Sequence, residues 1–143
     1  MPSGTGVMAR NLLRLHAYTG KKELLETSEL LFKKYASAYL ANPFGYASHL
    51  IALDSYLYHP KEFIVLVPED KSGHEMANIV LHHFIPNKVI LVQNPAHADP
   101  VFAPSLLSGR DIKDEQVTAF VCQNFTCSLP VTKVEEFKKL IEQ

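Results

Sequence analysis

The sequence has few cysteines and no excess of positive charge. The first bears on the cellular compartment of the protein, and the second on whether it binds nucleic acid. Only two of its 143 residues are cysteine, which is the usage of a cytosolic chain with reduced thiols. The formal net charge is −1, whereas a protein that binds the phosphate backbone of nucleic acid needs a clustered basic face. We therefore expect a cytoplasmic protein with no nucleic-acid partner.

Long apolar runs are also missing. The longest one, from Phe63 to Pro68, has the length of a strand, and a membrane-spanning helix requires roughly 20 apolar residues. Residues 1–6 contain no basic region followed by an apolar core, so we expect no signal peptide. Neither a membrane span nor a membrane partner is predicted.

The apolar residues of the first part of the chain recur at helical spacing. Apolar residues make up 47% of the chain and charged ones 20%, the balance of an ordinary globular domain. Three segments show the helical period: one that ends at Gly20, a second over about 21–40 and a third over about 45–58. This pattern predicts an antiparallel layer of three helices within residues 1–59.

The period changes after Pro60. Phe63–Val67 and Lys88–Val92 are continuous apolar runs, typical of strands buried on both faces, and a helical pattern lies between them. Such a βαβ unit has parallel strands. Val117–Val121 predicts a third strand, and Thr132 is the expected cap of a last helix.

Together these patterns predict an α/β fold in one domain, residues 1–143. The N-terminal three-helix layer, 1–59, is followed by a small parallel Rossmann-like sheet, 60–143, which contains the βαβ unit, the third strand and the C-terminal helix.

Several short segments resemble one large family. They are Pro2-Ser3-Gly4, Pro60-Lys61-Glu62, Pro86-Asn87-Lys88-Val89, Ser108-Gly109-Arg110 and Ala119–Val131. They are similar to the C-terminal end of the thioredoxin-domain-containing proteins related to spermatogenesis-associated thioredoxin-like protein. The most specific part is the Cys-X-Asn-X-X-Cys-X-X-Pro-Val segment that begins at Cys122. The resemblance implies a larger parent architecture: a thioredoxin-like domain, then an α/α toroid like those of glycosidases and sugar epimerases, then a small α/β tail.

The resemblance covers only the last part of the toroid and the tail, so we expect this chain to lack the thioredoxin-like domain and most of the toroid. Neither the redox motif of the former nor the carbohydrate site of the latter can therefore be transferred to it. The resemblance implies that the first three helices are the last ones of a toroid, without their neighbours. Their unmatched apolar faces lead us to expect a homo-oligomer formed through the helical layer. A structural remnant of a sugar-processing enzyme, working through a partner chain, is one alternative function.

The carboxyl ends of the predicted strands are the first candidate site, because ligands bind there in open parallel sheets. The helix that begins near Gly73 offers unpaired N–H donors to an anion, and amide side chains follow the strands. The pattern indicates a non-catalytic module for a small phosphorylated ligand such as a nucleotide. Neither the dinucleotide fingerprint nor the P-loop is present. The candidate ligand-binding residues are Pro68, Lys71, Ser72, Gly73, His74, Gln93, Asn94, Gln123 and Asn124.

The second candidate site is Cys122 with Cys127. The four residues between them can curl enough to bring the two thiols within disulfide range, and a labile disulfide or a thiolate there could serve redox chemistry. The spacing is not Cys-X-X-Cys, however, and no Lys or Arg stands within the turn. Two buried cysteines that pack as small hydrophobic residues are the alternative. Two thiols without two further ligands predict no metal site, and no catalytic residue is assigned.

Overall fold

The computed structural model describes residues 3–124 and 126–142. The chain divides between His59 and Pro60 into two compact units, a helical unit and an α/β unit. Within the described residues, no helix is long and apolar enough to cross a membrane.

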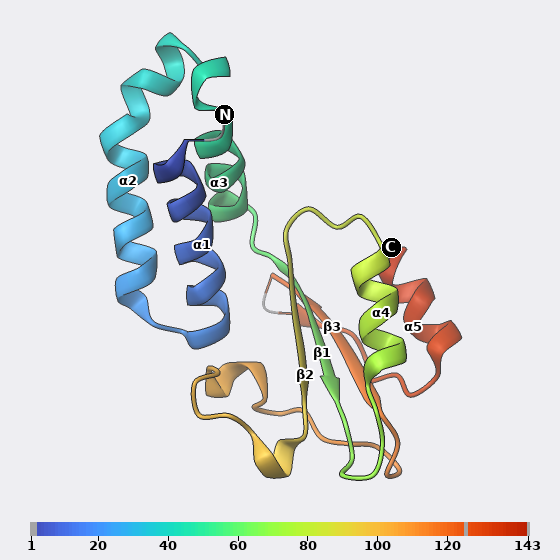
Figure 1. The fold of residues 1–143 in the computed structure, drawn as a ribbon. Helices are drawn as coiled ribbons and strands as arrows, with labels where there is room; N and C mark the ends of the chain where they lie inside the picture. The colour runs from blue at the N-terminus through green and yellow to red at the C-terminus, as the bar shows by residue number, and fades with distance from the viewer. Residues whose placement is uncertain (1–2, 125, 143) are drawn as a thin grey trace. The chain divides into compact units, whose positions relative to one another are not determined.

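The helical unit contains the three expected helices (Figure 1). They are α1 (Gly4–Thr19), α2 (Lys22–Ala41) and α3 (Ala47–Leu57), and a short 3-10 helix, η1 (Phe44–Tyr46), precedes α3. Helix α1 ends where the sequence predicted, at Gly20, whose φ of 68° is the left-handed conformation that glycine adopts most easily. The backbone N–H of Gly20 donates to the carbonyl of His16 and so closes the last turn.

Helix α1 packs against both of the other helices. Ala9, Phe32 and Ala52, one from each helix, form the buried centre of this unit. Gly6 allows α1 to lie directly on α3, since a Cβ there would come within 2.8 Å of the backbone N of His49. The small residues Gly6, Ala9 and Ala52 therefore allow α1 and α3 to approach each other closely.

The α/β unit holds a four-stranded sheet with two helices. The strands are β1 (Lys61–Leu66), β2 (Lys88–Gln93), β3 (Thr118–Gln123) and β4 (Thr126–Cys127), in the order β2-β1-β3-β4. The helices are α4 (His74–His82) and α5 (Val134–Ile141). Helix α5 begins one residue later than expected, with Lys133 and not Thr132 at its N-cap and with no side-chain capping bond.

The βαβ unit is confirmed: β1 and β2 are parallel, and Lys61 pairs with Lys88. The expected direction of the third strand is wrong, because β3 runs antiparallel to β1 with Leu66 opposite Thr118. The chain leaves β2 and enters β3 at the same end of the sheet, since the connection over residues 94–117 contains only 3-10 turns and no crossover helix. A parallel strand requires such a crossover. The sheet is therefore mixed.

Helices α4 and α5 lie on the same face of this sheet (Figure 1). Their core includes Phe63 and Val65 of β1, Met76 of α4 and Phe137 of α5, and the two rings meet edge to face at 6.4 Å. The alternate β1 residues Ile64 and Leu66 point to the opposite face and are also fully buried. Strand β1 is thus covered on both sides, as its continuous apolar sequence indicated.

Candidate functional site

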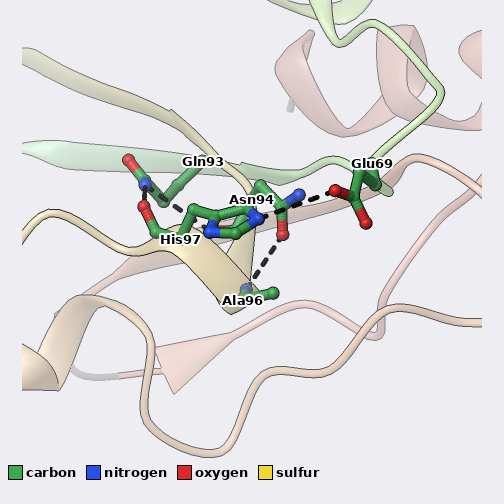
Figure 2. Close-up of polar contacts among 5 residues, drawn as sticks. All are labelled: Glu69, Gln93, Asn94, Ala96 and His97. Carbon is green, nitrogen blue, oxygen red and sulfur yellow. Dashed lines mark hydrogen bonds and ion pairs between the residues drawn. The ribbon is translucent and has the colours of Figure 1, made fainter.

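The carboxyl ends of β1 and β2 lie side by side, as expected. The backbone N of Val67 donates to the carbonyl of Gln93 at 3.0 Å. The polar groups beyond these ends bond chiefly to one another (Figure 2). Gln93 Nε2 donates to the His97 carbonyl at 2.8 Å, and Asn94 Oδ1 accepts from the N–H of Ala96 at 2.9 Å. The amide side chains of Gln93 and Asn94, which the sequence predicted as ligand contacts, therefore stabilise the 3-10 turn η2 (Pro95–His97).

A contact between His97 and Glu69 completes this cluster. His97 Nε2 lies 3.7 Å from Glu69 Oε1, across the two strand ends (Figure 2). Both side chains are largely exposed to solvent, so this contact contributes little to stability.

The residues between β1 and α4 likewise bond to or pack against other residues of the chain. Lys71 Nζ donates to the carbonyl of Glu115, and Ser72 Oγ accepts from the N–H of His74 at 3.2 Å. A Cβ at Gly73 would lie 2.8 Å from Val67 Cγ2 and 2.9 Å from a Val92 methyl group. Glycine is needed here for packing against the side chains of Val67 and Val92, so close approach of a ligand is not required to explain it.

Gln123 and Asn124 do not join this site. Because β3 is antiparallel, Cys122 pairs with Glu62, and the residues that follow Cys122 emerge at the amino end of β1. The expected convergence of three strand exits is therefore wrong. Seven of the nine candidate residues share one end of the sheet, and these two lie at the other.

The two cysteines are joined in a disulfide. Cys122 in β3 and Cys127 in β4 stand directly opposite each other in the hairpin, with their Cα atoms 4.0 Å apart. They differ in burial, because Cys122 is only 3% exposed and Cys127 is exposed at the edge strand. The disulfide that the spacing allowed is formed, and the alternative of two free buried thiols is not observed.

A cation lies against this disulfide. Arg110 Nη2 donates to Cys127 Sγ at 3.1 Å and to Cys122 Sγ at 3.3 Å. The turn between the two cysteines contains no Lys or Arg. Arg110 instead belongs to the connection between β2 and β3. No local pattern indicated the contact, although Ser108-Gly109-Arg110 was among the segments that carried the family resemblance.

The guanidinium of Arg110 is fixed by its own loop. Its Nη1 donates to the carbonyls of Ser105 and Ser108 at 2.8 and 3.4 Å. Gly109, with a φ of 72°, turns the chain back so that the Arg110 N–H reaches the Leu107 carbonyl at 3.2 Å. Arg110 Nε is buried and has no hydrogen-bond partner among the described residues.

This arrangement has a chemical consequence. Arginine keeps its charge at any physiological pH. A cation a few ångströms from sulfur stabilises the thiolate, which is both the nucleophile and the leaving group in disulfide exchange. The site therefore combines one accessible sulfur, one buried sulfur and a permanent positive charge shared by both.

Comparison with known proteins gives one set of relatives. Human spermatogenesis-associated protein 20 is 31% identical over 98% of this chain, and its mouse and rat counterparts are 28% and 29% identical over 99%. The chain spans only 18% of the length of each. No family model and no solved structure matches it. The chain is thus similar over nearly its whole length to one part of spermatogenesis-associated protein 20, which confirms the resemblance that its sequence segments indicated.

Proposed function

We propose that Cys122 and Cys127 form a thiol–disulfide exchange site. The observation that carries this proposal is the Arg110 guanidinium, which donates to both sulfurs, beside an exposed Cys127. A disulfide that serves only to link two strands needs no cation on its sulfurs. An exchange site gains from one at each step that releases a thiolate.

The difference in burial assigns the order of the steps. The thiolate of an external dithiol attacks the exposed Cys127 Sγ, and the intramolecular S–S bond breaks as the new mixed disulfide forms. Cys122 leaves as a thiolate beside Arg110 Nη2. The second thiol of the partner, after losing its proton, then attacks the partner's own sulfur in the mixed disulfide and releases Cys127. The partner is oxidised to a disulfide, and the cysteine pair is reduced to two thiols.

The competing role is a structural link within the β3–β4 hairpin. The two roles differ in reduction potential, because structural disulfides typically lie below about −300 mV, beyond the reach of glutathione. We expect the Cys122–Cys127 pair to equilibrate with glutathione buffers poised between about −200 and −300 mV. The measurement is the fraction of alkylated protein by mass spectrometry across a series of such buffers.

Two single variants test the assigned order. In Cys122→Ala, the remaining Cys127 is exposed and should form a mixed disulfide with a small aromatic disulfide reagent rapidly. In Cys127→Ala, the remaining Cys122 is 3% exposed and should react only slowly in the folded protein. A pair that stays oxidised at about −300 mV, together with two thiols that react only on unfolding, would remove the redox proposal.

A small phosphorylated ligand at the carboxyl ends of β1 and β2 remains a second hypothesis. Its support is the start of α4 at His74, beside the paired strand ends. The self-contained bonding of Gln93, Asn94 and Lys71 weakens it. A thermal-shift comparison with adenosine monophosphate tests it: a saturable increase in unfolding temperature, abolished in Lys71→Gln, would support it, and no shift at millimolar nucleotide would exclude it.

Self-association through the helical unit is a further part of the proposal. Large apolar side chains of this unit are exposed, among them Leu30, Leu40, Phe44 and Leu57. Such surface favours a partner, and a second copy is the simplest one. Light scattering at micromolar concentration should give a mass above that of the 16.1 kDa monomer. A monomeric mass, with co-purification of a larger toroid-containing protein, would instead favour the structural-remnant hypothesis.

A cytoplasmic location also belongs to the proposal. In a reducing compartment, a disulfide is formed chiefly where it takes part in catalysis or sensing. Rapid acid quenching and alkylation of cell fractions should recover the pair in the cytoplasmic fraction, in a reduced state that shifts on oxidant treatment.

A further inference from the structure

The helical unit has a hollow that none of the functions above uses as a ligand site, although Phe44 in its lining is also among the exposed apolar residues of the self-association proposal. It holds about 570 Å³ and lies along α1, the loop at η1 and the start of α3. This volume is within the range of roughly 300–1,000 Å³ that small-molecule sites occupy. Its lining residues are Gly6, Val7, Arg10, Asn11, Arg14, Phe44, Gly45, Ala47, Ser48 and Ile51.

The apolar part of this hollow is exposed to solvent. Phe44 is 94% exposed, and Val7 and Ile51 are 44% and 54% exposed. An aromatic ring and two branched side chains that line one concave surface would be better covered by an apolar ligand than by water.

The charged part carries one sign only. Arg10 and Arg14 stand one helical turn apart on α1, so both lie on the same side of the helix. Like charges at this spacing repel each other. Neither arginine forms a hydrogen bond or ion pair with any described residue, and no carboxylate is among the lining residues. The chain thus supplies two positive charges at the hollow and no counter-charge.

We propose that this hollow binds a small anionic amphiphile, a molecule with an apolar body and a carboxylate head. The body lies against Val7, Phe44 and Ile51. The carboxylate binds Arg10 and Arg14, whose planar guanidinium groups match carboxylate geometry. Asn11 also lines the hollow and supplies a further hydrogen-bond donor.

The lining residues require both the apolar body and the carboxylate head of the proposed ligand. Inorganic phosphate or acetate would pair with the two arginines but leave the apolar side chains exposed to water. A neutral alcohol of the same length would cover that surface and leave two like charges unpaired. Only a molecule that combines the two features complements the whole hollow.

The experiment uses octanoate as the probe and the full 143-residue chain. Isothermal titration calorimetry should give saturable binding of octanoate with one site per chain. Acetate and 1-octanol, the head and the body tested apart, should each bind at least tenfold more weakly. Backbone amide NMR should place the shifts at Gly6, Gly45 and Ser48.

Matched variants locate the charge contribution. Arg10→Gln and Arg14→Gln should each weaken octanoate binding several-fold, and the double variant should abolish it. Lys22→Gln removes one exposed positive charge from α2, outside the hollow, and should leave the affinity unchanged. Phe44→Ala should weaken octanoate while the thermal unfolding of the protein stays the same, because this side chain is almost fully exposed.

Three results would overturn the proposal. They are the absence of saturable octanoate binding, equal affinity for octanoate and 1-octanol, and a loss in Lys22→Gln as large as that in Arg14→Gln. None of them bears on the cysteine pair, which lies in the α/β unit.

Discussion

Arg110 lies 17 residues before Cys127 in the sequence, and its Nη2 donates to the Cys127 Sγ at 3.1 Å. The contact depends on two separate structural features. The turn at Gly109 orients the arginine, and the β3–β4 pairing positions the sulfur. A charged group held in this way is preorganised, because it need not move when charge develops on the sulfur.

The first prediction concerns this contact. In the reduced protein, Arg110→Gln should slow the alkylation of Cys127 by iodoacetamide at neutral pH by about threefold to tenfold. The reason is that loss of the cation lowers the thiolate fraction, while the remaining thiolate becomes somewhat more nucleophilic. The rate is measured in the Cys122→Ala background, where Cys127 is the only thiol.

The matched control is Lys113→Gln, which removes a positive charge from the same connection. Its backbone N–H donates to Thr118 Oγ1, and this substitution leaves that bond in place. Alkylation at the parental rate in Arg110→Gln, or an equal loss in Lys113→Gln, would mean that Arg110 acts only as a structural anchor.

The second prediction concerns the stability that the disulfide provides. The two cysteines are 5 residues apart, so the loop they close is short and its closure restricts the unfolded chain only modestly. Reduction should lower the free energy of unfolding of the α/β unit by about 2 kcal/mol. Urea unfolding followed by circular dichroism, with and without a phosphine reductant, measures this difference. The Cys122→Ala/Cys127→Ala double variant should give one midpoint under both conditions.

The sequence was sufficient to predict the helices and the βαβ unit, because each signal there is local. Gly20 stops α1 where the apolar period ends, and the runs at Phe63 and Lys88 are buried strands on either side of a helical pattern. Two apolar runs separated by one helix leave little choice of direction.

The direction of β3 was not predictable in the same way. An apolar run such as Val117–Val121 has the same pattern in a parallel and in an antiparallel strand. Its direction depends on the 94–117 connection, which stays at one end of the sheet. The contact of Arg110 with both sulfurs follows from that same connection, so the sequence pattern could indicate neither.

The third prediction tests the close approach of α1 and α3. Gly6→Ala should lower the stability of the helical unit by about 1–3 kcal/mol, because the new Cβ would come within 2.8 Å of the Ser48 and His49 backbone. Gly4→Ala is the matched control in the same helix, since nothing lies within 4 Å of its Cβ position. Gly4→Ala should leave the thermal midpoint unchanged or slightly raised. Equal effects of the two variants would contradict the packing role of Gly6.

The fourth prediction concerns His49, which is 1% exposed and surrounded by aromatic rings. The ring centroids of Tyr35 and Tyr46 lie 4.9 and 5.3 Å from its own. Its Nε2 is 2.9 Å from Thr5 Oγ1, and its Nδ1 has no partner among the described residues. Burial disfavours the charged imidazolium and lowers the pKa of His49 below the ordinary value of 6.5.

The sign of the pH dependence follows from this shift. Between the lowered pKa of His49 and 6.5, the unfolded chain binds more protons than the folded one, so the free energy of unfolding falls as the pH falls through that window. Thermal melts followed by circular dichroism from pH 7.5 to about 5 should show the helical unit losing stability. His49→Phe should remove most of this loss, and His16→Gln, on α1, should retain it. If wild type and His49→Phe lost stability in parallel, the protonation of His49 could not be its cause.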